Sequence, residues 1–313
     1  MTETFNKMKG NWLHSNLLSM DSNQEVLEEV LYILSLFSPY FDTKPVSDAF
    51  TTTVKLFKGI YPGYRASNTE YHDLRHTTDT LLAMARLTHG AVLNGMSLTD
   101  RNICVGLIAA LLHDSGYVQE EHDKEGTGAK YTVNHVQRSM DLLEYLGAEF
   151  KLTGKEIIAG RMMIQCTDLA EDVTTIIFPG AEIELLSKLL GAADLLAQMA
   201  DRMYLEKLLF LYRELKEAGV GGYADEVDLL KRTVGFYDFI ARRLEILLNG
   251  NDRFMISHFE SRWQINENLY QKSIERQRNY LKHILKKSDS DPLDYLKRGG
   301  VIEKVRRKYG EID

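Results

Sequence analysis

Apolar residues recur through most of the chain at the three- and four-residue spacing that is typical of amphipathic helices. Residues 22–25 (SNQE) have the sequence of a capping box, in which a serine and a glutamate satisfy the first free N–H groups of a helix, and residues 153–156 (TGKE) repeat it. Further helices are predicted from about residue 72 to 87, from a cap at Ser97 to about 111, over 182–217 up to Gly219, over 225–248 up to Asn249 and Gly250, and over about 262–286.

Strands are not predicted. No segment shows the strict alternation of a half-buried strand, and residues 173–178 (VTTIIF), the one β-prone run, are too isolated to build a sheet. No internal repeat or polar linker marks a domain boundary. The pattern predicts an all-α, single-domain helical bundle. Its N-terminal helices (1–60) pack on a core (61–250), which is followed by a C-terminal helix and basic tail (251–313).

The charge balance narrows the classes of partner. Among 313 residues, 38 Lys and Arg against 45 Asp and Glu give a net charge of −7. Such a balance argues against a DNA-binding protein that relies on an overall basic surface. Residues 272–308 are the exception, with 12 Lys and Arg against 5 Asp and Glu. This region is either a solvated helix and tail or a surface for an anionic partner.

Cysteine usage and apolar run length indicate the compartment. Cys104 and Cys166 lie in apolar runs without zinc-binding spacing, so both are predicted to be reduced core residues. The most apolar run covers only residues 104–112, whereas a membrane span needs about 18 residues or more. The N-terminal sequence has no signal-peptide pattern. We therefore expect a cytoplasmic protein without a membrane partner.

Two histidine pairs are the first candidates for chemistry. His72 and His76 are spaced i, i+4, so on a helix they would lie one above the other on a single face. Metal binding and ordinary surface placement both explain such a pair. His113 and Asp114 follow a strongly apolar helix, where burying polar groups is costly unless something satisfies them. A divalent cation would do so, and the alternative is a core histidine followed by a capping aspartate.

Asp194 is a third candidate. It is a lone carboxylate among small and apolar residues (LLGAADLL, 189–196) inside a predicted helix. A carboxylate in such surroundings needs a cation or a strong hydrogen-bond donor. The small residues at 191–193 would let another element approach closely.

In this order, H…HD…D, these residues resemble the HD-domain superfamily of metal-dependent phosphohydrolases. Three local sequences resemble its cyclic-nucleotide phosphodiesterase branch. Residues 71–76 (YHDLRH) are similar to the YHNxxHA motif of that branch, residues 166–169 (CTDL) to its ATDM segment, and residues 234–239 (VGFYDF) to its VGFIDY segment. The resemblance spans about residues 71–240, preserves the order of the motifs, and implies an HD-type helical bundle.

The resemblance also implies a site for two divalent metal ions. The first ion, Zn, Mn, Fe or a similar metal, would be held by His76, His113, Asp114 and Asp194. Asp114 would bridge to a second, largely hydrated ion, for which Mg or Mn is suitable. A bridging hydroxide would attack the phosphorus of a small phosphoester, in particular a nucleotide phosphodiester. His72 would protonate the departing sugar oxygen as the general acid.

Four further residues are candidates around this site. His135 would line the site or be an ordinary helix residue, and Asp168 would orient a ligand or simply close a turn. Thr233 stands where the family has an amide side chain that hydrogen-bonds the base, so the resemblance implies a different base contact here. Phe236 would stack on the base or belong to the core.

Alternatives stay open. A nucleotide phosphomonoesterase of the same superfamily would need an extra cation near the site, for which the loop at 115–130 offers Lys124 and Lys130. A non-catalytic HD module that binds a nucleotide, and an interaction module that uses the basic C-terminal region, are the others. The family's histidine shortly after the HD pair is replaced by Tyr117, so the specificity residues depart from the family while the catalytic residues match.

Overall fold

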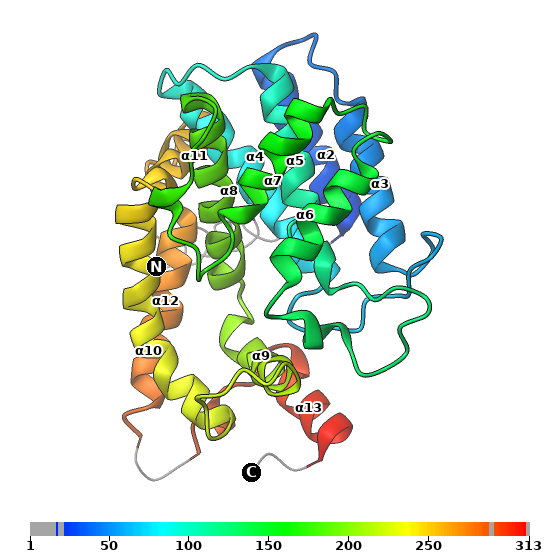
Figure 1. The fold of residues 1–313 in the computed structure, drawn as a ribbon. Coiled ribbons are helices and arrows are strands. Elements are labelled where there is room, and N and C mark those ends of the chain that lie inside the picture. The colour runs from blue at the N-terminus through cyan, green and yellow to red at the C-terminus, as the bar shows by residue number, and fades with distance from the viewer. Residues whose placement is uncertain (1–16, 18–21, 288–290, 311–313) are drawn as a thin grey trace.

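The structure, a computed structural model, describes residues 17, 22–287 and 291–310. Among these residues it contains twelve α-helices, short 3₁₀ turns and no strand beyond two isolated bridges (Figure 1). The all-α prediction is confirmed. The helices are α2 (Asn23–Phe37), α3 (Lys44–Phe57), α4 (Leu74–Leu93), α5 (Asp100–Leu112), α6 (His135–Leu146), α7 (Gly154–Gln165), α8 (Ala181–Ala200), α9 (Tyr204–Glu217), α10 (Glu226–Arg242), α11 (Phe254–Trp263), α12 (Leu269–Ile284) and α13 (Val301–Tyr309).

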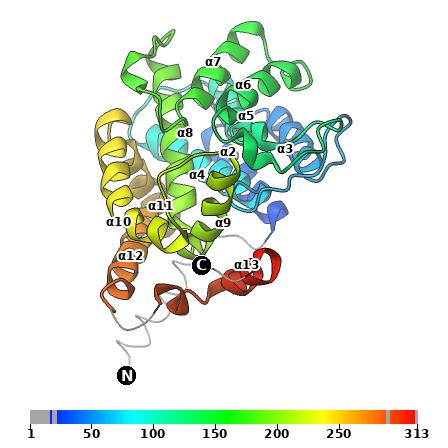
Figure 2. The ribbon, with the colours of Figure 1, turned by 60° about the horizontal axis from the view of Figure 1, so that its bottom comes forward.

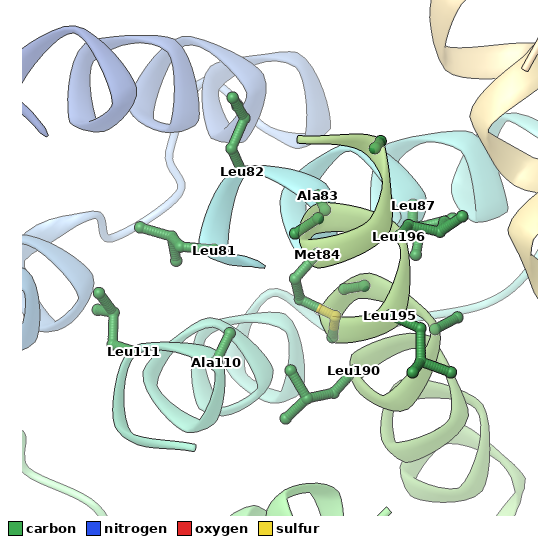
Figure 3. Close-up of a cluster of buried hydrophobic side chains, with 14 of the residues drawn as sticks. Leu81, Leu82, Ala83, Met84, Leu87, Ala110, Leu111, Leu190, Leu195 and Leu196 are labelled. Carbon is green, nitrogen blue, oxygen red and sulfur yellow. The ribbon is translucent and has the colours of Figure 1, made fainter. Parts of the chain in front are cut away.

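Helix α4 lies at the centre of the bundle and packs against α2, α5, α8 and α11. Its side chains are buried almost without interruption from His76 to Ala91, and α5 is buried from Ile103 to Leu112. A helix that is apolar all round has to be covered on every side, which α5 achieves between α3, α4, α7 and α8. Figure 3 shows the apolar side chains through which α4, α5 and α8 meet.

Both predicted capping boxes are present. The side chain of Ser22 accepts a hydrogen bond from the N–H of Glu25, whose carboxylate accepts one from the N–H of Ser22, and Thr153 and Glu156 do the same at α7. The two cysteines are free and buried, as predicted. Within the described residues, no helix has the length and apolar character needed to cross a bilayer.

Ser97 was predicted to cap the helix that runs to about residue 111, and this prediction is wrong. Helix α5 is capped by Thr99, whose side chain accepts a hydrogen bond from the N–H of Asn102. Both the N–H and the hydroxyl of Thr99 donate to the carboxylate of Glu182 at the start of α8. A tertiary contact therefore decides which of two suitable capping residues is used.

The continuous helix predicted over 182–217 is also wrong, because it divides into α8 and α9 at residues 201–203. Asp201 is extended there (φ −54°, ψ 130°), and its carboxylate accepts a hydrogen bond from the N–H of Met203 while its carbonyl accepts one from Tyr204. A short carboxylate side chain competes with the helix for backbone hydrogen bonds. Helix α9 therefore starts anew, and Figure 1 shows it beyond the end of α8. Gly219, with a left-handed φ of 68°, follows the end of α9 as predicted.

The last third of the chain is more divided than predicted. In the segment expected to be one helix over 225–248, the α-helical part, α10, ends at Arg242. A π-helical turn, Arg243–Leu247, follows it directly. The helix expected over 262–286 begins later than predicted, because Gln264, with a left-handed φ of 57°, ends α11, and α12 starts only at Leu269. Helices α3, α6, α11 and α13 are absent from the prediction.

Candidate metal centre

Three core helices bring the candidate ligands together. His76 lies in the first turn of α4, where the N-cap Asp73 accepts a hydrogen bond from its N–H. His113 is the C-cap of α5 and Asp114 follows it, while Asp194 lies within α8. The apolar contacts among α4, α5 and α8 (Figure 3) therefore fix the relative positions of all four side chains.

The ligand atoms of these four residues converge. His76 Nε2 and His113 Nε2 are 3.3 Å apart, and each lies 3.4 Å from Asp114 Oδ2. Asp194 Oδ1 lies 2.9 Å from His76 Nε2 and 3.5 Å from His113 Nε2. Ligands held about 2.0–2.2 Å from one ion are separated by about 3.0–3.5 Å in octahedral or tetrahedral geometry. The buried group of His76, His113 and Asp114 could therefore hold a metal ion, with Asp194 beside it.

Two of these atoms have the character of metal ligands. Asp114 Oδ2 is buried and accepts no hydrogen bond, an arrangement that costs a carboxylate about 1–3 kcal/mol or more. His113 Nδ1 lies 2.8 Å from the carbonyl oxygen of Ala110 and donates to it, because a carbonyl can only accept. The neutral ring of His113 then presents the lone pair of Nε2 to the cluster, as metal-bound histidines do.

Protons balance the charge of this cluster when no cation is bound. Burial alone would lower the pKa of His113, but the carboxylates of Asp114 and Asp194 raise it to about 9. Burial opposes ionisation of Asp194 too, yet hydrogen bonds from His113 and His76 hold its pKa well below the usual range. Binding of a cation at His113 Nε2 would therefore displace a proton.

His72 lies outside the helix on which it was predicted. Asp73 caps α4, so His72 precedes the cap instead of lying one turn before His76 on a helix face. His72 Nδ1 donates to Glu214 Oε2 at 2.7 Å. Glu214 Oε1 in turn accepts from the N–H groups of residues 70–71, at 2.8 and 2.7 Å. Glu214, from α9, is thus anchored on one oxygen and binds the imidazole with the other.

This contact favours the charged form of His72. Burial lowers the pKa of His72, but the neighbouring Glu214 carboxylate outweighs that effect and raises the pKa above its ordinary value. The ring centroid of His72 lies 6.4 Å from that of His76. The imidazole of His72 therefore lies close to the candidate metal centre, and the hydrogen bond to Glu214 occupies its Nδ1.

Tyr117 lies between two imidazoles. Its ring stacks on His72 at 4.3 Å and 11° on one side and on His135 at 4.5 Å and 22° on the other. Only 1% of Tyr117 is exposed. Stacking on a buried ring restricts the rotation of both imidazoles. Tyr117, which stands where the resembled HD-domain superfamily has a histidine, therefore has a packing role.

His135 opens α6 beside Asp114. Its Nδ1 donates to the carbonyl oxygen of Thr132 at 2.7 Å, and its Nε2 lies 3.7 Å from Asp114 Oδ1. Burial lowers the pKa of His135, so the ring stays neutral. Gly116 permits this approach, because a Cβ at that position would lie 2.0 Å from the carbonyl oxygen of His135. The glycine after the HD pair thus brings α6 against the site.

The other predicted residues are not joined to the cluster. Asp168 accepts a hydrogen bond from the N–H of Ala170 in a turn, at 2.8 Å. The hydroxyl of Thr233 donates to a carbonyl one turn earlier in α10, and Phe236 stacks on Phe239 with centroids 5.9 Å apart. Within the described part of the chain, no hydrogen bond or ring contact links Asp168, Thr233 or Phe236 to the four ligand residues.

Glu214 is the site residue that the sequence analysis missed. It belongs to residues 213–217 (RELKE), a charged run that is typical of a solvated helix face. The one signal that points inward is its spacing from Phe210, which lies one turn earlier and is 5% exposed.

A family model described as Npun_R2479-like matches residues 62–272, about two thirds of the chain. The matched span contains the four ligand residues and also His72, Tyr117, His135 and Glu214, and it ends before α13. No curated protein matches the chain. The family description names no reaction, so the function has to be argued from the site.

Proposed function

The chain belongs to the Npun_R2479-like family, and we propose that it is a metal-dependent phosphohydrolase that cleaves a small phosphodiester, a cyclic or linear nucleotide. One observation carries the proposal. Ligand atoms from three helices converge at separations of 2.9–3.5 Å beside a histidine, His72, that donates a hydrogen bond to a buried carboxylate, and this carboxylate raises its pKa.

The four converging residues would hold the first ion, which would be Zn, Mn, Fe or a similar metal. Asp114 would share a second ion, Mg or Mn, through its other oxygen. Divalent ions bound here would neutralise charge on the phosphoryl oxygens and lower the pKa of a bound water. His135 faces Asp114 Oδ1 as a neutral ring and so adds no charge that would repel a cation.

His72 would supply the proton that the reaction needs. An alkoxide is a poor leaving group, so the departing sugar oxygen has to be protonated as its bond to phosphorus breaks. Glu214 binds Nδ1 of His72, which leaves Nε2–H as the proton to be transferred, and the ring of Tyr117 restrains the imidazole. In the next cycle, the water molecule that becomes the attacking hydroxide would give up a proton, and this proton would restore His72.

The surroundings of Lys130 give no support to a substrate with a terminal phosphate. A phosphomonoesterase would need an additional cation at the site, and Lys130 was one of two lysines available for it. Lys130 Nζ instead lies 2.5 Å from Asp123 and 2.6 Å from the carbonyl oxygen of Glu125. A module that bound a nucleotide without cleaving it would differ from an enzyme in turnover, which the following screen measures.

A substrate screen of the Mn-loaded protein tests the proposal, with release of nucleotide or phosphate from diesters and monoesters as the readout. We expect diesters to be cleaved. His72→Ala should lose about 10²–10⁴-fold on nucleotide diesters while keeping its metal, and much less on a nitrophenyl diester, whose leaving group needs little protonation. His122→Ala removes a histidine whose side chain is 82% exposed and serves as the control. The proposal fails if no phosphoester is cleaved with any metal, or if monoesters are preferred.

A further inference from the structure

The C-terminal helix α13 lies against α9, the helix that carries Glu214. Val301, Ile302 and Val305 are buried, whereas the basic residues of α13 lie on its other faces. Figure 2 shows α13 next to α9. This helix is outside the part of the chain that the family model matches.

Three groups of α13 bind one carboxylate, that of Glu70. Lys304 Nζ lies 2.8 Å from Glu70 Oε1, and Oε2 receives Lys308 Nζ at 2.9 Å and the hydroxyl of Tyr309 at 2.6 Å. The side chain of Glu70 is 14% exposed. Burial raises its pKa, but the three donors outweigh this and lower it. We refer to these interactions of Lys304, Lys308 and Tyr309 with Glu70 as the Glu70 contact.

The backbone of Glu70 is bound to the same carboxylate that holds His72. Its N–H and that of Tyr71 both donate to Glu214 Oε1, and Glu214 Oε2 accepts from His72 Nδ1. A displacement of Glu70 would therefore shift Glu214, and with it the orientation of His72.

We propose that Glu70 is a positioning residue and that α13, through the Glu70 contact, holds the His72–Glu214 pair in the arrangement needed for proton donation. The inference rests on the proposed function, because it assigns a reaction to His72. If α13 served only to cover the apolar face of α9, loss of the Glu70 contact would change stability and leave proton donation intact.

The test removes the two ion pairs and keeps the buried face of α13. Lys304→Met with Lys308→Met retains the length of both side chains. Arg306→Met with Arg307→Met removes the same charge from exposed positions of the same helix and is the matched control. Amide hydrogen exchange at residues 70–71 reports the backbone bonds to Glu214 directly, without any substrate.

We expect exchange at residues 70–71 to rise about 5–20-fold in the lysine double variant and to stay at the wild-type rate in the control, because each exposed ion pair contributes up to about fivefold to an equilibrium constant. Turnover of a nucleotide diester should fall several-fold, turnover of a nitrophenyl diester should not, and the metal content should be unchanged. Glu70→Gln removes the charge of the carboxylate that the two lysines bind. It should also lower turnover of the nucleotide diester and leave turnover of the nitrophenyl diester unchanged.

Unchanged exchange in the lysine variant, an equal rise in the arginine control, or an equal loss on both substrates would overturn the inference. A wild-type protein that cleaves no diester would overturn the proposed function instead, and the exchange rates would still decide whether α13 positions Glu214.

Discussion

Replacing Glu214 with glutamine tests the role of His72 with little change of shape. The amide keeps an oxygen for the N–H groups of residues 70–71 but removes the negative charge opposite His72 Nδ1. The pKa of His72 should then fall, because burial lowers it and the Glu214 carboxylate is the main group that raises it. A general acid works only when protonated, so the alkaline limb of the pH–rate profile should move to lower pH.

The size of this shift follows from the contact. His72 Nδ1 and Glu214 Oε2 are 2.7 Å apart, and the two side chains are only 13% and 7% exposed, so water cannot replace the lost charge fully. A hydrogen bond to a charged group contributes about 1.5–3 kcal/mol, against about 1 kcal/mol for a neutral one. The difference corresponds to about one pKa unit. We expect the alkaline limb of the pH–rate profile to move down by about one pH unit. At pH values above this limb, the rate should fall about tenfold.

The assay is kcat/KM for a nucleotide diester as a function of pH, with the metal content of each variant measured in parallel. Glu217→Gln is the control, because this carboxylate lies on the same helix but binds Thr127 in place of His72. A limb that stays in place, moves to higher pH, or moves equally in Glu217→Gln would refute the assignment of His72.

Two further predictions concern stability. Gly90→Ala should lower the free energy of unfolding by about 3 kcal/mol or more, because the new Cβ would lie 1.8 Å from the carbonyl oxygen of Phe254 in α11; wild-type stability in urea unfolding would contradict this packing of α4. Burial raises the pKa of Asp79 from its ordinary value of 3.8 to about 7 in the folded, metal-free protein. Between pH 3.8 and pH 7 the folded protein therefore keeps a proton that the unfolded chain has released. The free energy of unfolding consequently falls as the pH rises through this range. Asp79→Asn should therefore stabilise the metal-free protein by up to about 4 kcal/mol above pH 7 and have no effect at acid pH, which unfolding of both proteins at several pH values checks; a stability difference that does not vary with pH would show that Asp79 is ionised throughout.

Three of the four candidate ligand residues stand out in the sequence because they contrast with their neighbours. His113 and Asp114 end a helix that is apolar all round, and Asp194 interrupts a run of leucine, alanine and glycine. Burial of such residues follows from helical periodicity alone. Their convergence does not, because it depends on how α4, α5 and α8 pack, and only the resemblance to a known family suggested it beforehand.

What the sequence did not reveal depends on single side chains and long-range contacts. Asp201 and Gln264 interrupt helices whose periodicity continues across them, and Glu182 selects Thr99 over Ser97 as a cap. Glu214 looks like a surface residue until α9 is placed beside His72. Local patterns contain no information about these partners.

The metal content of the purified protein tests the central claim most directly. After chelation and reconstitution with Mn or Zn, elemental analysis should find at least one tightly bound ion per wild-type chain. Asp114→Ala should lose this ion, because it removes the buried Oδ2 that has no other partner, whereas Asp141→Ala, which removes an exposed carboxylate, should keep it. A wild-type chain that binds no metal, or an Asp114→Ala protein with full metal content, would contradict the account.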